Sequence, residues 1–403
     1  MISGRGRQDS IRILHLITTL DVGGAEVMLM RLLTALDPNL FSSRVVCMAG
    51  PGEIGEQIGL LGIPVSCLDF QRGRIALFGI FKWFKILHEY RPEIIQAWMY
   101  HANLMALSAP LAVVNARVFW NIQASGRDPS GFKALTRGVI RTCSRLSAFP
   151  EAVIVNSKKG VADHCRMGYR SGNLNYIPNG FDVNLYLPLN PEIRRQIRRT
   201  LGIDDETPCV GMFARYHPVK DHFTALLAAR GVQESGLRTH FFFAGAGVDH
   251  GNAALCRLIS RLGLESSAHL LGYRKDVASL MAAMDTVISC SHSEGLSNVI
   301  GEAMAAGVPC VVTDVGDSAL VVDDTGKIVK PQDPEALARA ILEILRMPAD
   351  KRKALGGKAR ARIQHHYAIE KVADTYSRLY QKAILKKSLR VRKSNGQKNR
   401  SIG

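Results

Sequence analysis

Two cations lie close together where a strand is predicted to end and a helix to begin. They are Arg215 and Lys220, in the segment FARYHPVKD. Breaking a bond to a nucleoside diphosphate leaves extra negative charge on the departing phosphate, and fixed cations can neutralise that charge. Arginine can donate two parallel N–H groups to a phosphate, and lysine provides a compact positive charge. The N-terminus of the helix behind them adds a partial positive charge. The alternative, that either cation is a solvated surface charge, stays open from these residues alone.

Two carboxylates, Glu294 and Glu302, are spaced eight residues apart further along the chain. A predicted strand, 286–290, delivers Glu294 into a loop. Three residues after it supply the free amides of a new helix: Leu296, Ser297 and Asn298. Glu302 interrupts an otherwise apolar helix about one turn further in, where it could bind ribose hydroxyls, and a near-buried carboxylate needs partners. The alternative is that Glu302 forms an ion pair with a neighbouring cation and that Glu294 caps the helix.

A third candidate is the pair Gly23 and Gly24, which follows the first predicted strand and opens a helix. In a doubly wound sheet the ligand lies beyond the carboxyl ends of the strands, and glycine lets backbone amides approach an anion at a helix start. The pair does not form the G-x-G-x-x-G fingerprint, so a plain tight turn remains the alternative to a phosphate site.

The elements that must position these residues alternate along the whole chain. Short apolar or β-branched segments, typical of strands, are separated by helical patterns. The predicted strands are 11–17, 44–48, 64–68, 94–97, 117–121, 152–156, 175–177, 209–213, 240–244, 269–271, 286–290 and 310–313. This βαβα alternation in both halves predicts an α/β protein with two parallel sheets covered by helices.

The domain boundary is predicted within 181–191, which follows a Pro-Asn-Gly turn and contains two further prolines. This divides the chain into an N-terminal domain, 1–185, and a C-terminal domain, 186–367. A last helix, 368–385, is expected to pack back on the N-terminal domain. The basic tail, 386–403, has almost nothing to bury and is expected to be disordered.

Composition and charge exclude several classes of protein. The chain has 403 residues, of which 47% are hydrophobic and 22% charged, as in a soluble globular protein. None of the eight cysteines forms a C-x-x-C pair, and no signal peptide or apolar membrane span is found, so a cytoplasmic protein is expected. The net charge is +17, but residues 351–403 hold sixteen Lys and Arg against two acidic residues. Because the charge gathers in the tail and no base-stacking motif accompanies it, no specific nucleic-acid partner is predicted.

Taken together and in order, these motifs resemble the retaining glycosyltransferases of family 4, group 1, which have the GT-B fold. Glu294 and Glu302 are followed by AMAAGVPCVVTD, and the other matching segments are GGAE, IPNGFD, the Arg215 to Lys220 segment and LGYRKDV. The resemblance covers roughly 11–385. It implies two Rossmann-like doubly wound domains facing a central cleft that holds a nucleotide-sugar donor.

The resemblance also implies a role for each candidate residue. Arg215 and Lys220 would bind the diphosphate, Glu302 the ribose, and Glu294 the sugar and phosphate together with the amides of Leu296, Ser297 and Asn298. The backbone of Tyr273 and Arg274 would flank the base, while Gly23 and Gly24 would close on the phosphates from the N-terminal side. Family members need no divalent ion. The absence of a D-x-D motif agrees independently, so no metal site and no cofactor are predicted.

One departure from the family concerns the sugar. Many relatives carry a histidine after the strand that corresponds to 117–121, where it can touch the donor sugar; here Gln123 or a neighbour takes that place. His101, which follows an earlier strand, is the nearest replacement. A structural role for this histidine remains the alternative.

The predicted function is transfer of a hexosyl group, with retention, from a UDP- or GDP-sugar to a glycan or lipid-linked acceptor in bacterial polysaccharide, lipopolysaccharide or glycolipid synthesis. The alternative is a catalytically silent protein that binds nucleotide sugars and has a regulatory role. A basic stripe on the predicted helix 131–147 suits an anionic membrane on the inner face of the cell, although a solvated face explains it equally: Lys133, Arg137, Arg141 and Arg145.

Overall fold

The computed structural model describes residues 10–70, 77–124 and 133–398, with side chains as far as 385. The chain forms two compact units, one of residues 1–180 and 369–403 and the other of residues 181–368. The chain first passes from one unit to the other between Gly180 and Phe181, and not between 185 and 186 as predicted. The reason is that Phe181 is fully buried in the core of the second unit, where its ring packs so closely on Gly301 that a Cβ there would lie 2.2 Å away.

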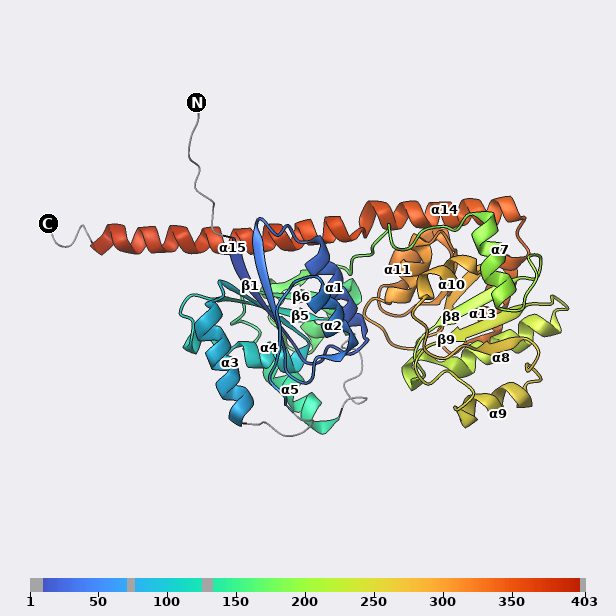
Figure 1. The fold of residues 1–403 in the computed structure, drawn as a ribbon, viewed down its shortest axis with the longest axis horizontal. Helices are drawn as coiled ribbons and strands as arrows, with labels where there is room; N and C mark the ends of the chain where they lie inside the picture. The colour runs from blue at the N-terminus through green and yellow to red at the C-terminus, as the bar shows by residue number, and fades with distance from the viewer. Residues whose placement is uncertain (1–9, 71–76, 125–132, 399–403) are drawn as a thin grey trace, which may run out of the picture. The chain divides into compact units, whose positions relative to one another are not determined.

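A seven-stranded sheet forms the centre of the first unit (Figure 1). All its neighbours are parallel, in the order β3-β2-β1-β4-β5-β6-β7. The strands are β1 (Ile11–Ile17), β2 (Phe41–Cys47), β3 (Val65–Cys67), β4 (Ile94–Trp98), β5 (Arg117–Ile122), β6 (Ala152–Val155) and β7 (Leu174–Tyr176). Their apolar runs have little alternation because both faces of the sheet are covered.

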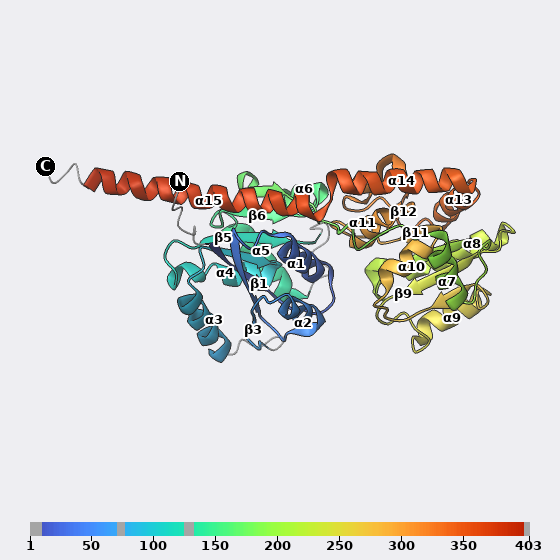
Figure 2. The same ribbon diagram turned by 45° about the horizontal axis from the view of Figure 1, so that its top comes forward.

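Successive side chains of β1 enter two different cores. Ile13 and Ile17 face the side covered by α1 (Gly24–Ala35), α2 (Gly52–Leu60) and the start of α15 (Ile369–Lys398). Leu14 and Leu16 face the side covered by α3 (Leu77–Tyr90), α4 (Tyr100–Ala106) and α5 (Ala134–Leu146). Figure 1 and Figure 2 show α15 beside α1 and on the side of the sheet away from α3. The described part of the unit also contains η1 (Ala109–Leu111), α6 (Lys158–Arg166) and η3 (Ser171–Asn173).

The second unit has a six-stranded parallel sheet in the order β10-β9-β8-β11-β12-β13. The strands are β8 (Cys209–Phe213), β9 (His240–Ala244), β10 (Ala268–Leu270), β11 (Thr286–Ser289), β12 (Cys310–Thr313) and β13 (Lys327–Val329). One face is covered by α8 (His222–Glu234), α9 (Ala253–Arg261) and α13 (Pro334–Leu345). The other is covered by α10 (Val277–Ala283), α11 (Asn298–Ala305) and α14 (Ala349–His366). The remaining helices are α7 (Pro191–Thr200), η4 (Pro218–Lys220), α12 (Ser318–Val322) and η5 (Asp323–Thr325).

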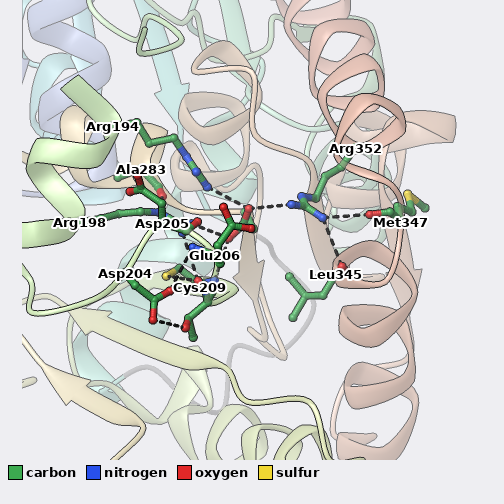
Figure 3. Close-up of polar contacts among 12 residues, drawn as sticks. Arg194, Arg198, Asp204, Asp205, Glu206, Cys209, Ala283, Leu345, Met347 and Arg352 are labelled. Atoms are coloured by element: carbon green, nitrogen blue, oxygen red, sulfur yellow. Dashed lines mark hydrogen bonds and ion pairs between the residues drawn. The ribbon is translucent and has the colours of Figure 1, made fainter. Parts of the chain in front are cut away.

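A buried carboxylate holds the amino edge of this sheet together. Asp285, just before β11, accepts bonds from Arg198 at 2.5 Å, Arg194 at 2.9 Å, Arg352 at 3.1 Å and the backbone amide of Cys209 at 2.9 Å. Figure 3 shows Arg194 and Arg198 approaching from one side and Arg352 from the other. The two cations on α7 and the one on α14 thereby fasten both helices to the starts of β8 and β11.

Two parallel Rossmann-like sheets confirm the predicted fold class. The predicted disorder of 386–403 is wrong as far as Lys398, because α15 continues through that part of the tail. The segment contains no proline and is rich in Lys and Arg, which extend a helix at little cost. None of the described helices is both long enough and apolar enough to cross a bilayer.

Candidate functional site

The loops at the carboxyl edge of the second sheet are joined to one another by backbone hydrogen bonds. The bonds run from Tyr216 N to Ala246 O (2.8 Å), Gly245 N to Gly272 O (2.8 Å), His292 N to Val219 O (3.0 Å) and Asp317 N to Gly295 O (2.9 Å). They connect the loops that follow β8, β9, β10, β11 and β12. Ligands of open parallel sheets bind outside this edge, so these loops form a single platform at the expected place.

Two glycines make the close approach of these loops feasible. Gly316 has a φ of +52°, and a Cβ there would lie 2.1 Å from the carbonyl oxygen of Gly295. Gly245 has a φ of +156°, and its Cβ would lie 2.2 Å from the carbonyl oxygen of Ala214. Any side chain would push the loops apart. Sequence reasoning missed both glycines, although a glycine within two or three residues of the end of a strand is a usable signal.

Lys220 and Glu294 meet on this platform. The Lys220 ammonium forms an ion pair with Glu294 Oε1, which also accepts a hydrogen bond from Ser291 Oγ at 2.8 Å. Both charged side chains are only partly exposed, Lys220 by 24% and Glu294 by 16%. The cation predicted for the diphosphate and the carboxylate predicted for the sugar and phosphate are therefore brought into contact, and Ser291 joins them.

A sharp turn between η4 and α8 directs Lys220 to this place. Asp221 has a φ of +53°, in the left-handed region, and its carboxylate caps α8 by accepting from Thr224 N at 3.1 Å and Thr224 Oγ1 at 2.7 Å. Such a cap compensates the cost of an unusual backbone conformation. Arg215 lies two residues beyond β8 on the same loop and is exposed.

Glu302, on the second turn of α11, is 8% exposed. The helix begins at Asn298, with Ser297 as its N-cap, and both Ser297 and Leu296 are buried. The three predicted amide positions thus coincide with the start of a helix that follows directly on Glu294. A helix start of this kind leaves backbone N–H groups available to an anion.

The loop after β10 carries the predicted base-flanking residues. Tyr273 is 47% exposed. Arg274 forms two hydrogen bonds with Asp276, of 2.8 and 2.7 Å, and the pKa of its guanidinium is raised by them. The Arg274 side chain is therefore paired with Asp276, while 39% of its surface stays exposed.

Gly23 and Gly24 lie at the start of α1 in the first unit, and the carboxylate of Glu26 lies next to them. A Cβ on Gly23 would lie 2.3 Å from Glu26 Oε2, and Thr19 Oγ1 donates to Glu26 Oε1 at 3.1 Å. The side chain of Glu26 turns back over the helix start, and a side chain at position 23 would have to displace it. An anion could reach these amides only if Glu26 moved aside.

His101 and Gln123 follow β4 and β5, two neighbouring strands, at the carboxyl edge of the first sheet. Both are half-buried. Burial lowers the pKa of the His101 imidazole, so it is neutral near pH 7. The structure therefore places the candidate residues in two groups: His101, Gln123 and the glycine pair in the first unit, the remainder in the second.

The described residues contain no group of three or more His, Cys, Asp or Glu side chains arranged to hold a metal ion. All eight cysteines are free thiols, and five of them are buried. Burial raises the pKa of the Cys209 and Cys310 thiols to about 12, so both are unreactive core residues.

Comparison with known proteins gives two family matches that follow each other along the chain. Residues 22–185 match the model described as Glycosyltransferase Family 4, and residues 193–362 match the model described as Glycosyl transferases group 1. Each match falls largely within one structural unit. Lys220, Glu294 and Glu302 all lie in the second match.

Individual relatives show the same resemblance. The chain is 26% identical over 329 residues to the putative glycosyltransferase EpsF of Bacillus subtilis, covering 75% of this chain and 79% of that protein. Over 216 residues it is 26% identical to the GDP-mannose-dependent monoacylated alpha-(1-6)-phosphatidylinositol monomannoside mannosyltransferase of Corynebacterium glutamicum, covering 51% and 55%. The crystal structure of Anabaena HepE in complex with UDP and glucose has a TM-score of 0.80 at 24% identity, covering 92% of this chain and all of that one.

Proposed function

The chain belongs to the group 1 glycosyltransferases of the GT-B fold, and we propose that it transfers a hexosyl group, with retention, from a UDP- or GDP-sugar to a glycan or lipid-linked acceptor. Its relatives include a phosphatidylinositol monomannoside mannosyltransferase and a lipopolysaccharide core biosynthesis mannosyltransferase. The donor would bind on the loop platform of the second unit.

The observation that carries the proposal is the ion pair between Lys220 and Glu294. It gathers a cation, a carboxylate and a serine hydroxyl at the carboxyl edge of a parallel sheet, and the exposed Arg215 lies on the same loop as Lys220. A diphosphate would compete with Glu294 for the ammonium and would release the carboxylate toward the sugar. Lys220 and Arg215 would then offset the charge that develops on the departing phosphate, as a metal ion does in other transferases.

The other residues fit the rest of a nucleotide sugar. The amides at the start of α11 would hold a phosphate oxygen, and the Glu302 carboxylate would accept hydrogen bonds from ribose hydroxyls. In retaining transfer the acceptor hydroxyl attacks the anomeric carbon on the face from which the nucleoside diphosphate departs. The new C–O bond forms as the old one breaks, and the hydroxyl proton passes to the departing phosphate oxygen. The neutral His101 would hydrogen-bond a sugar hydroxyl.

A nucleoside diphosphate should stabilise the protein without added metal. A ligand that binds only the folded state at 100 times its Kd adds about 2.7 kcal/mol to the free energy of unfolding. We expect UDP or GDP to raise the melting temperature and EDTA to leave that rise intact, because Arg215 and Lys220 supply the positive charge. Thermal shift with each nucleotide, with and without EDTA, measures this and shows which base is preferred.

Glu302→Gln serves as the control for the ribose contact. This variant should lose most of the rise produced by the nucleotide while keeping that produced by inorganic pyrophosphate. An absolute requirement for Mg²⁺ or Mn²⁺ in transfer would contradict the metal-free proposal. Tight binding of a nucleotide sugar without any turnover or slow hydrolysis would favour a silent regulatory protein.

We also propose that the first unit meets an anionic membrane, where a lipid-linked acceptor would reside. Three large apolar side chains at the start of α3 are exposed: Leu77, Phe78 and Phe81. Arg141 and Arg145 on α5 are exposed, as is Lys133, the residue before that helix. Apolar and basic side chains on one unit suit the boundary between lipid head groups and acyl chains.

Vesicles that contain anionic lipid should bind the protein, and moderate salt should release it. Each Lys or Arg near such a surface contributes about 1 kcal/mol, and residues 386–403 hold seven of them. Truncation after Ile384 should therefore weaken vesicle binding and leave nucleotide affinity unchanged, because the donor residues all lie before 330. Co-sedimentation at two salt concentrations measures the effect. Equal binding by the truncated and full-length proteins would assign the membrane contact to α3 and α5 alone.

A further inference from the structure

The second unit contains a cavity between the start of α8 and one side of α9. Its volume is about 460 Å³, which is within the range of small-molecule sites. Both helices cover the same face of the sheet, whereas α11 covers the opposite face. The cavity adjoins the loop platform, but its lining contains none of the four charged residues proposed to bind the donor: Arg215, Lys220, Glu294 and Glu302. The donor contacts proposed above therefore do not use it.

One wall of the cavity is a stripe of four residues along α9. Side chains three and four positions apart lie on the same side of a helix. The stripe has this spacing and consists of Ala254, Arg257, Leu258 and Arg261. Leu255, which also lines the cavity, is buried and packs in the core below. The wall is thus apolar and carries two guanidinium groups one helical turn apart.

The opposite wall is aromatic. Tyr216 is 44% exposed and Phe223 57% exposed, and Pro218 lies on the loop between them. His222, which is 3% exposed, lines the cavity at its buried end. Burial lowers the pKa of His222 to about 4, although the carbonyl of Ala214 favours the protonated ring, so the imidazole is neutral near pH 7. An exposed apolar patch with a charged rim is typical of a ligand-binding groove.

The charge at the rim is positive. Arg257 and Arg261 are exposed, and neither forms an ion pair with a residue that the structure describes. Asp221 also lines the cavity, but its carboxylate is occupied by the amide and hydroxyl of Thr224. Burial and nearby cations lower the pKa of His217, so this residue adds no charge near pH 7. Like charges one turn apart disfavour each other, and an anion between the two arginines would relieve that repulsion.

We propose that this cavity is a second ligand site, which takes a small aromatic molecule with one negative charge. The aromatic ring would lie between Phe223 and Leu258, above His222. The anionic group would accept hydrogen bonds from Arg257 and Arg261. Guanidinium groups suit such a ligand because they both pair with anions and stack on aromatic rings. The site is separate from the loop platform and does not depend on the proposed glycosyltransfer.

A titration with 2-naphthoate tests the chemistry of the site, since this probe combines a flat apolar ring with one carboxylate. With UDP or GDP present at saturation, so that the anion sites of the loop platform are filled, 2-naphthoate should bind with a Kd of about 1 mM or lower. 2-Naphthamide keeps the shape without the charge, and acetate keeps the charge without the ring. Each should bind at least about 10-fold more weakly. Ligand-observed NMR measures all three.

Variants at the rim test the location of the site. Arg257→Gln and Arg261→Gln should each weaken 2-naphthoate binding about 3-fold, and the double variant about 10-fold, because both cations are exposed to solvent. Ala254→Phe places a ring in the cavity from an exposed position and should abolish saturable binding. Arg339→Gln, at an exposed arginine on α13, is the matched control and should stay within about 2-fold of wild type.

A second measurement locates the probe in the wild-type protein. The methyl signals of Leu258 should shift on addition of 2-naphthoate, whereas those of Leu320, a partly exposed leucine on α12, should not. Equal binding of 2-naphthoate and 2-naphthamide would overturn the proposal. Displacement of the probe by UDP or GDP would also overturn it, because the probe would then be bound on the loop platform. If the protein binds no nucleotide, the proposed function fails, while the same titration without nucleotide still decides whether this site exists.

Discussion

Lys220→Ala and Arg215→Ala are each expected to lower turnover by about 100-fold or more, which corresponds to about 3 kcal/mol of transition-state stabilisation. Each variant removes a cation placed where the departing diphosphate gains charge. The effect should appear mainly in kcat, because the extra charge exists only in the transition state. Steady-state kinetics with the preferred nucleotide sugar measures it.

The surroundings of the two cations predict a difference between the variants. Lys220 is paired with Glu294, so its loss leaves that carboxylate with the Ser291 hydroxyl but without a cation, and disturbs the sugar side of the site as well. Arg215 is exposed on its loop, and its loss should leave the arrangement of Glu294 intact. Lys220→Ala should therefore raise the donor KM more than Arg215→Ala does.

The fold should survive both changes, since neither side chain belongs to a core. Lys351→Ala, at an exposed position on α14, controls for the loss of a positive charge and should retain full activity. Near-normal turnover in either Lys220→Ala or Arg215→Ala would refute the assignment of that residue to the leaving group.

Asp285→Asn is expected to lower the free energy of unfolding by about 3–5 kcal/mol, because it leaves the buried Arg198 and two partly buried arginines without their counter-charge. The carboxylate receives three guanidinium groups and one backbone amide, and Arg198 beside it is 1% exposed. Asparagine has nearly the same shape, so the loss reports charge and not packing. Urea denaturation followed by circular dichroism measures it.

The pH dependence of this difference follows from the pKa of Asp285. Burial alone would raise that pKa, but Arg198, Arg194 and Arg352 together hold it below the ordinary value. A lowered folded-state pKa contributes stability above the unfolded value of about 3.9, and that stability is lost as pH falls through the folded-state pKa. The gap between wild type and Asp285→Asn should therefore be full at pH 7 and shrink in acid.

Glu234→Gln is the matched surface control. Glu234 pairs with Arg230 on α8 but is 59% exposed, so its replacement should cost less than about 1 kcal/mol. A loss of that small size in Asp285→Asn would show that the cluster does not hold α7 and α14 to the sheet.

Periodicity and chain order alone were enough to predict the parallel architecture. Of the strands in the described part of the chain, only β13 (Lys327–Val329) was missed. Lys220 and Glu294 could also be placed together from the sequence, because a loop after a buried strand in a parallel sheet must emerge at the carboxyl edge. Local sequence determines that placement.

The contacts of distant residues were decided by tertiary structure. Nothing in the sequence near Phe181 indicates that it enters the second core, since the glycine that admits its ring lies at 301. Asp285 reads as an ordinary polar residue before a strand until Arg194, Arg198 and Arg352 converge on it from two helices. Tyr376 reads as one apolar position in a helix, and only the packing of α15 on the sheet brings its hydroxyl to Asn121. The physical reason is that periodicity records which side of an element is buried, whereas a hydrogen bond or an ion pair depends on which partner the folded chain brings to that side.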